Sequence, residues 1–311
     1  ADLDLAANDL AKSAFGHAGQ KCSAASLGIL IGSVYSNKQF LKQLVDCVES
    51  MKVGFGSQAD ASVGPLIELP SEKLLRALTV LDEGETWLLE PKRLDQSGRL
   101  WRPGIKIGVK ENSFFHQTEV FGPVLGLIFA KDLDYALRIQ NGTDYGLTAG
   151  IHSLNVSEIS YWLENIEAGN LYVNRGITGA IVERQPFGGF KRSAVGFGLK
   201  AGGRNYLLQF GSFSDDGEAS IPASENNNHE SVMEFLDPEK RIWLKQAIAS
   251  DNYWLNHYYQ PETLDPGPIA IEANYHRYIP VGKHVIVRAS DNDELAELLR
   301  LSIAAKAAGG L

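Results

Sequence analysis

Residues 118–152 read TEVFGPVLGLIFAKDLDYALRIQNGTDYGLTAGIH. Within this stretch an apolar run at residues 120–129 precedes a helical pattern at 133–140, and a second apolar run follows at 149–152. Short apolar runs separated by helices of this length are typical of strands that alternate with helices and form parallel sheets. The stretch therefore predicts an α/β layer with parallel strands.

The same alternation continues on both sides of this stretch. Toward the N-terminus, apolar positions repeat at helical spacing over residues 3–15 and 40–51, and residues 27–35 have the composition of a strand. Toward the C-terminus, residues 157–166 predict a helix and residues 171–174 a strand. We therefore expect a parallel sheet flanked by helices.

The composition changes at residues 212–230, SFSDDGEASIPASENNNHE, where acidic, polar and small residues prevail. Such a segment buries little apolar surface, so we predict a linker or a mobile flap. Beyond it, residues 232–248 predict a helix, and residues 206–210 before it have the pattern of a strand. Aromatic residues gather after this helix, and we interpret them as packing residues: Tyr253, Trp254, Tyr258 and Tyr259.

The end of the chain predicts one strand and one helix. Residues 284–288 alternate as in a strand, and Asp291 and Glu294 have the spacing of a capping box before a helix that starts near Leu295. One strand with one helix is half of a βαβ unit. We therefore expect residues 231–311 to be a truncated C-terminal domain.

Composition excludes several classes of partner. The 311 residues suggest about two domains, and 29 basic against 38 acidic residues give a net charge of −9, which would repel nucleic acid. Apolar runs are far shorter than the roughly 20 residues of a membrane-spanning helix, so we predict no transmembrane segment. The chain opens at Ala1 without a secretory signal, and we expect an excised piece, truncated at both ends.

Two cysteines cannot form a disulfide framework, and no Cys and His residues have the spacing of a zinc site. We therefore expect a reducing, cytoplasmic location and no metal. Cys22 follows a glycine-containing break and precedes small residues that could begin a helix, where the helix dipole and Lys21 would favour its thiolate. Local context leaves open a nucleophile or a small buried residue. Cys47 lies between Leu44 and Val48 on an amphipathic helix, so we expect it in the core.

Four segments carry a resemblance to a known family. FGHAGQKCSA at 15–24 resembles the active-site segment of the aldehyde dehydrogenase superfamily, and TEVFGPVL at 118–125 is similar to its cofactor-contact segment. NGTDYGLTAGI at 141–151 and GNLYVNRGITGAIVERQPFGGFKRSAVG at 169–196 resemble its following segments, in the same order. The resemblance implies an α/β catalytic domain over 1–211, with an oligomerisation strand near 205–211, followed by a partial α/β C-terminal segment.

The loop ITGAIVERQPFGG at 177–189 resembles the aldehyde-anchoring loop of L-glutamate γ-semialdehyde dehydrogenases, also called pyrroline-5-carboxylate dehydrogenases. With its long tail, the chain looks like the C-terminal part of bifunctional proline utilization proteins, in which a proline dehydrogenase module with FAD precedes the aldehyde dehydrogenase. EANYHRYIPVGKHVIVR at 272–288 looks like the start of an extra domain related to the nucleotide-binding fold. The resemblance implies that the chain forms a homo-oligomer or contacts the missing domains of its parent. Any peripheral association with a membrane would take place through the missing modules.

The resemblance also implies the chemistry. The Cys22 thiolate would attack the aldehyde to form a thiohemiacetal, which loses hydride to NAD, and water would hydrolyse the resulting thioester. Glu119 would accept hydrogen bonds from the nicotinamide ribose, and Phe121 would pack beside the nicotinamide ring. The family's oxyanion-stabilising Asn and general-base Glu would lie upstream of this chain, so we expect the segment alone to be inactive.

The aldehyde itself would carry a carboxylate and an ammonium at its other end. The backbone N–H groups of Gly179 and Ala180 would bind the carboxylate, Ser23 would donate its hydroxyl, and Phe187 would cover the aliphatic middle. Two other functions stay open: an assembly module that covers a substrate tunnel without catalysis, and an aldehyde dehydrogenase of other specificity. His17 is a weak candidate for the base of Cys22, because nearness in sequence does not establish geometry.

Overall fold

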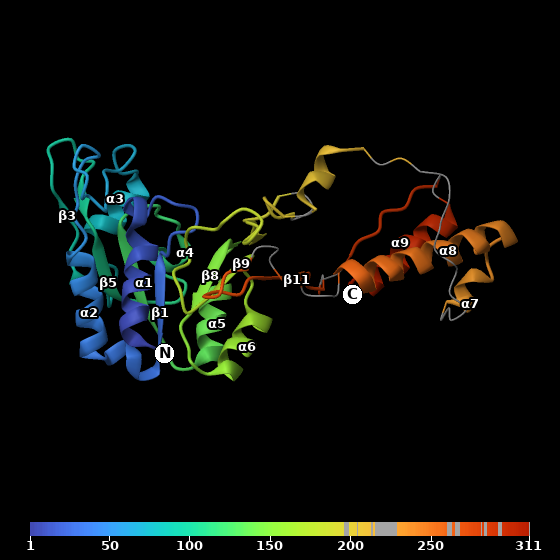
Figure 1. Ribbon diagram of the computed structural model, residues 1–311, viewed down its shortest axis with the longest axis horizontal. Coiled ribbons are helices and arrows are strands. Elements are labelled where there is room, and N and C mark those ends of the chain that lie inside the picture. The colour runs from blue at the N-terminus through green and yellow to red at the C-terminus, as the bar shows by residue number, and fades with distance from the viewer. Residues whose placement is uncertain are drawn as a thin grey trace. The chain divides into compact units, whose positions relative to one another are not determined.

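The structure is a computed structural model that describes residues 1–195, 199–203, 205–212, 214, 229–259, 263–264, 268–280, 282, 285–291 and 294–310. It divides into two compact units (Figure 1). The first unit comprises Ala1–Val182 with Pro186–Tyr206, and the second comprises Glu183–Gln185 with Leu207–Leu311. The candidate site residues all lie in the first unit.

A four-stranded sheet forms the centre of the first unit, in the order β1 (Leu27–Ile31), β6 (Val124–Ala130), β5 (Gly104–Val109) and β2 (Thr86–Leu89). β1, β6 and β5 are parallel, as predicted, whereas β2 is antiparallel to β5. The chain returns from β2 to β5 through the short antiparallel pair β3 (Lys92–Arg93) and β4 (Trp101–Arg102), without a crossover helix. Parallel strands need such a crossover, so this connection explains the one antiparallel neighbour.

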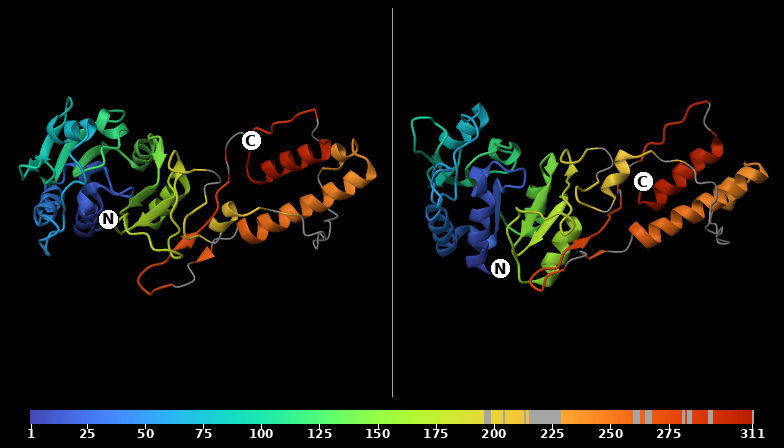
Figure 2. Two further views of the ribbon diagram at one scale, coloured as in Figure 1. Left: turned by 90° about the horizontal axis from the view of Figure 1, so that it is seen from above. Right: turned by 45° about the horizontal axis from the view of Figure 1, so that its top comes forward.

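Two helices, α1 (Leu3–Phe15) and α2 (Lys38–Glu49), lie side by side over this sheet (Figures 1 and 2). Asp2 and Asn37 cap them by accepting hydrogen bonds from the first backbone N–H groups, which otherwise lack partners. Cys47 packs at the edge of the core, as predicted. The core itself combines the apolar faces of the helices with both faces of the central strands: Ala7, Phe15, Phe40, Leu44, Ile105, Leu125 and Leu127.

A smaller parallel pair, β8 (Thr148–Ile151) and β9 (Asn170–Val173), is joined by α6 (Val156–Asn165). α5 (Leu133–Asn141) packs beside α6 and completes this second core, which is built on Leu137, Ala149, Trp162, Ile166 and Ala168. The other elements of the first unit are short. They are α3 (Glu72–Thr79), α4 (Phe114–Gln117), the 3₁₀ helices η1 (Gly16–Gly19) and η2 (Gly32–Ser36), and the pair β7 (Tyr145–Gly146) and β10 (Phe190–Lys191).

The second unit is mainly helical, with α7 (Glu230–Met233), α8 (Pro238–Trp254) and α9 (Leu295–Ala307). Figure 2 shows α8 and α9 side by side, and they share the buried residues Leu244, Ile248 and Ala296. The predicted helix at 232–248 is interrupted, because Pro238 lacks the N–H that a continuous helix needs, and Asp237 caps a new start. The aromatic cluster lies at the end of α8 and in η4 (Leu255–Tyr259), where the rings of Trp254 and Tyr258 pack in a tilted arrangement with their centroids 4.4 Å apart.

Several sequence predictions for this unit were wrong. Residues 206–210 form the 3₁₀ helix η3 (Tyr206–Phe210) and not a strand. The Tyr206 N–H donates to the Gly203 carbonyl at 3.1 Å, the local spacing of a 3₁₀ turn. Residues 285–288, the described part of the predicted strand 284–288, are also irregular; β11 (Thr263–Leu264) pairs instead with β12 (Tyr275–His276).

The start of α9 also differs from the prediction. No capping box forms, because the helix begins at Leu295 and Glu294 is therefore its N-cap residue and not its third residue. The Glu294 carboxylate caps no N–H group and pairs with Lys240 at 2.9 Å. Gly309 follows the helix in the left-handed conformation, which is common for a glycine after the end of a helix. Most of the predicted linker, residues 213 and 215–228, lies outside the described residues.

A buried ion pair connects β5 to the loop before β2. The Lys106 ammonium lies 3.0 Å from the Glu85 carboxylate, and both side chains are 2% exposed. Lys106 also donates to the Val80 carbonyl at 3.0 Å and lies between the rings of Trp87 and Phe115, 5.1 and 4.9 Å from their centroids. These contacts compensate for the removal of the ammonium from water.

We predict that Lys106→Met lowers the free energy of unfolding by about 3–5 kcal/mol, because it leaves the buried Glu85 carboxylate without its cation. Urea denaturation measures the change. Lys42→Met is the control, since Lys42 pairs with Asp46 on the exposed face of α2 and its loss should change stability little. Equal effects of the two substitutions would contradict the prediction.

Candidate functional site

Cys22 lies in an exposed turn between η1 and β1. Three consecutive residues before it, His17, Ala18 and Gly19, adopt the left-handed conformation, with φ of 55°, 54° and 69°. The Ala24 N–H then donates to the Lys21 carbonyl at 3.1 Å and closes the turn around Cys22. A thiol in this position is accessible to a ligand.

The sequence predicted a helix start at Cys22, and this was wrong. The chain turns at Cys22 and continues into β1, because the Ser26 carbonyl already accepts from the Gly126 N–H at 3.0 Å in β6. The small residues that follow Cys22 therefore lead into a strand that pairs with the central sheet and do not form a helix. No helix dipole acts on the thiol from its own segment.

The turn is held against residues 119–122 by a close approach of two backbones. A Cβ on Gly19 would lie 2.3 Å from the Gly122 carbonyl oxygen, so no other residue fits there without movement. The Gln20 side chain adds two hydrogen bonds, one to the Phe121 carbonyl at 3.3 Å and one from the Ile67 N–H at 3.0 Å. Gln20 thereby connects the cysteine turn to two other loops, a role that the sequence analysis missed.

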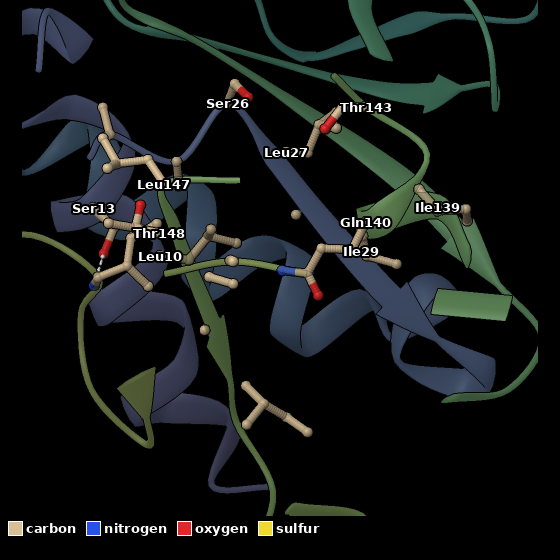
Figure 3. A pocket seen from close by; sticks show the side chains of 18 of the residues that line it. Leu10, Ser13, Ser26, Leu27, Ile29, Ile139, Gln140, Thr143, Leu147 and Thr148 are labelled. Carbon is tan, nitrogen blue, oxygen red and sulfur yellow. Dashed lines mark hydrogen bonds between the residues drawn. The ribbon is translucent and has the colours of Figure 1, made fainter. Parts of the chain in front are cut away.

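A groove of about 660 Å³ has Cys22, Glu119 and Phe121 in its lining. Figure 3 shows other lining side chains, which come from α1, β1, α5 and the segment that leads into β8: Leu10, Ser13, Leu27, Ile29, Gln140, Leu147 and Thr148. The lining is mostly apolar, which suits a pocket that excludes water. The structure thus places the three residues of the first two predicted segments in one groove.

Glu119 and Phe121 both present their side chains to solvent. Glu119 is exposed and forms neither a hydrogen bond nor an ion pair with any residue that the structure describes. Phe121 has a φ of 55°, a conformation that bulky residues rarely adopt, and its ring is 37% exposed. Strain of this kind persists only where neighbouring contacts hold the backbone, here through Gln20 and Gly19.

The anchoring loop is connected to the cysteine turn through Ser13. The Ser13 hydroxyl, buried on α1, accepts from the Ile177 N–H at 3.1 Å, and the Ser13 carbonyl accepts from the Ala25 N–H at 3.0 Å. Gly179 has a φ of 85° and open space around its α-carbon. The N–H groups of Gly179 and Ala180 have no hydrogen-bond partner among the described residues, so they remain available as donors.

Four of the predicted residues do not line the groove: Ser23, Gly179, Ala180 and Phe187. Ser23 is buried; its carbonyl accepts from the Thr148 hydroxyl at 3.4 Å, and its own hydroxyl bonds to no described residue. Only the first residue of the loop, Ile177, lines the groove, together with Arg175 just before the loop. His17 is exposed and is absent from the lining, which agrees with its weak candidacy as a base.

His152 and Asp9 form a polar spot in the groove lining. The imidazole Nε2 lies 3.7 Å from the Asp9 carboxylate, and burial lowers the pKa of His152 below its ordinary value of 6.5, although Asp9 opposes that shift. His152 is therefore neutral at pH 7. Among the residues that the structure describes, no cluster of His, Cys, Asp and Glu could hold a metal ion, and no helix is long and apolar enough to cross a bilayer.

Comparison with known proteins identifies the family. The model of the aldehyde dehydrogenase family matches residues 1–213. The chain belongs to this family. 1-Pyrroline-5-carboxylate dehydrogenases from Geobacillus sp. (strain WCH70) and Bacillus subtilis (strain 168) are each 41% identical to this aldehyde dehydrogenase chain over 209 residues. That is 67% of this chain, which spans about 40% of the length of these relatives.

Solved structures extend the similarity to the whole chain. Proline utilization A (PutA) from Corynebacterium freiburgense is 44% identical, with a TM-score of 0.90, and the match covers 100% of this chain and 31% of that one. A Thermus 1-pyrroline-5-carboxylate dehydrogenase with bound NAD is 37% identical, with a TM-score of 0.60 over 68% of this chain and 40% of that one. The predicted α/β fold and the predicted family resemblance are confirmed.

We predict that Gly19→Ala displaces the cysteine turn, because its Cβ would overlap the Gly122 carbonyl. The rate at which a thiol reagent modifies Cys22 should change. The free energy of unfolding should fall by more than about 2 kcal/mol, because the left-handed backbone strains an alanine and its Cβ overpacks the contact with Gly122. Gly32→Ala is the control, since Gly32 has a φ of 57° but nothing within 4 Å of an added Cβ. Equal losses in both variants would show that the close approach is unimportant.

We also predict that His152 makes stability sensitive to acid. Its pKa is lower in the folded chain than in the unfolded chain, so the unfolded state binds the proton more readily. The resulting stabilisation is present above pH 6.5 and is lost as the pH falls below it. The measurement is the free energy of unfolding at pH 7.5 and at pH 5.5, about one unit on either side of this value. The difference between the two pH values should be smaller in His152→Phe than in the unchanged protein, whereas His17→Phe should leave it unchanged. The same difference in both variants would refute the prediction.

Proposed function

We propose that this chain is the cysteine-bearing part of an NAD-dependent aldehyde dehydrogenase that oxidises L-glutamate γ-semialdehyde to L-glutamate in proline catabolism. The observation that carries the proposal is the placement of an exposed Cys22 in one groove with Glu119 and Phe121. The names of the relatives, 1-pyrroline-5-carboxylate dehydrogenase and PutA, support the substrate.

In the proposed reaction the Cys22 thiolate attacks the aldehyde carbon and forms the C–S bond of a thiohemiacetal. Bound NAD would accept the hydride that this carbon loses. Water then cleaves the resulting thioester, which releases the carboxylic acid and restores the thiol. The Cys22 backbone N–H is available to stabilise the oxyanion, because it donates to no acceptor among the described residues.

The residues present fit the nicotinamide end of NAD. Glu119 has an exposed carboxylate with no partner among the described residues, and both of its oxygens can accept from the two hydroxyls of a ribose. The Phe121 ring is partly exposed and its backbone is fixed by Gln20, so it can pack against a flat ring. We propose that these two residues hold that end of the cofactor. The FAD of a PutA-type parent would belong to a proline dehydrogenase module elsewhere.

At the other end of the substrate we propose that the Gly179 and Ala180 N–H groups bind the α-carboxylate, with Ser23 as a further donor and Phe187 against the methylene groups. The free amides in the anchoring loop support this role, because a carboxylate can accept from two adjacent N–H groups. The unbonded Ser23 hydroxyl agrees with it.

We further propose a catalytic domain over 1–211, a linker or flap over 212–230 and a C-terminal domain that includes residues 231–311. The family match ends at residue 213, and the compact units divide between Tyr206 and Leu207, which supports a boundary in this region. We propose a cytoplasmic protein that forms a homo-oligomer or contacts the other domains of its parent. The free cysteines Cys22 and Cys47 suit a reducing compartment.

The decisive test is Cys22→Ala in the complete protein that carries this chain. We expect NADH formation with L-glutamate γ-semialdehyde to fall by roughly 10³-fold or more, because the covalent step is lost. Cys47→Ala is the matched control, since Cys47 packs against the core and should leave turnover nearly unchanged. Normal turnover in the folded Cys22→Ala protein would reject the proposal.

A further inference from the structure

The backbone of Phe187 is held by a two-residue bridge. The Phe187 N–H donates to the Ala201 carbonyl at 2.9 Å, and the Ala201 N–H donates back to the Phe187 carbonyl at 2.8 Å. Both polar groups of the Phe187 backbone are therefore satisfied, which fixes the direction in which its side chain leaves the chain.

Asn170, the first residue of β9, holds the residues on either side of Phe187. Its side chain is buried; the Nδ2 group donates to the Pro186 carbonyl at 3.0 Å, and Oδ1 accepts from the Gly188 N–H at 3.1 Å. One amide side chain thus binds the residue before Phe187 and the residue after it. The amide must keep this orientation for both bonds to exist.

Lys200 completes the arrangement and fixes the Asn170 side chain. Its Nζ donates to Asn170 Oδ1 at 3.2 Å, to the Gly188 carbonyl at 3.0 Å and to the Gly169 carbonyl. Burial lowers the pKa of Lys200 to about 8, so at pH 7 the protonated ammonium offers three donors to three acceptors. Lys200 forms no ion pair with a described carboxylate, which distinguishes it from Lys106.

These bonds account for every polar backbone group from Pro186 to Gly188. We propose that Lys200, acting through Asn170 and Gly188, is a positioning residue that fixes Phe187 and thereby sets the KM for the amino-acid aldehyde. The proposal rests on the proposed function, in which Phe187 covers the methylene groups of the substrate. Lys200 itself need not touch the substrate.

A neighbouring lysine provides a matched control. The Lys191 side chain is 17% exposed, pairs with Glu167 at 2.7 Å and donates to the Asn141 and Thr143 carbonyls. It is therefore a second largely buried lysine whose ammonium binds backbone carbonyl groups. It makes no hydrogen bond to residues 186–188, so its loss should not move Phe187.

The experiment compares Lys200→Met and Lys191→Met in the complete protein. For Lys200→Met we expect the KM for L-glutamate γ-semialdehyde to rise about tenfold, because the buried hydrogen bonds that position Phe187 are lost. The kcat should stay nearly unchanged. The KM for NAD and the kcat/KM for acetaldehyde, which lacks the methylene groups and the carboxylate, should stay the same. Lys200→Gln keeps one amide donor and should give an intermediate KM.

Hydrogen exchange gives a readout that does not depend on activity. The amides of Phe187 and Gly188 should exchange faster in Lys200→Met than in the unchanged protein or in Lys191→Met. An unchanged semialdehyde KM in Lys200→Met, or an equal rise in Lys191→Met, would overturn the inference while the proposed function stands. If Lys200→Met does not fold, an unchanged KM in Lys200→Gln overturns it. Absence of semialdehyde oxidation in the unchanged protein would instead reject the proposed function.

Discussion

The site depends on the approach of two glycine backbones, Gly19 in the cysteine turn and Gly122 after Phe121. Because no side chain separates them, the turn that carries Cys22 packs directly on the segment that carries Glu119 and Phe121. Cys22 therefore lines the same groove as Glu119 and Phe121, although about 100 residues of sequence separate them. Gln20, in the same turn as Gly19, also donates a hydrogen bond to the Phe121 carbonyl, and this bond helps to hold the strained backbone of Phe121.

Polar side chains extend this arrangement to the loops around it. Ser13 connects the cysteine turn to the anchoring loop, and Asn170 with Lys200 holds the turn at Phe187. None of these residues is a chemical group of the proposed reaction. Each satisfies backbone groups of a loop that has no sheet to pair with, and such loops keep a single geometry only when their polar groups are bound.

Sequence patterns located the helices α1, α2, α5, α6 and α9 and the strands β1, β6, β8 and β9, because burial of one face imposes a period that is visible in the residues. They predicted no element between Met51 and Thr118, although the strands β2 and β5 of the central sheet lie there. They failed where a local preference competed with a distant partner. Cys22 precedes small residues suited to a helix, yet the Gly126 N–H draws the chain into β1. The sequence predicts a strand at residues 206–210, but these residues form the 3₁₀ helix η3.

The sequence by itself determined the family, the cysteine, and the alternation of strands and helices over residues 118–174, since these follow from motifs and from periods within about 20 residues. It could not show that Gln20, Ser13 and Lys200 connect the loops, because each bonds to backbone groups of residues distant in the chain. Every residue has such backbone groups, so the amino-acid sequence does not reveal which of them a side chain binds. Only the tertiary structure decided which polar groups became buried together. Burial makes an unpaired polar group costly, and that cost selects the partners.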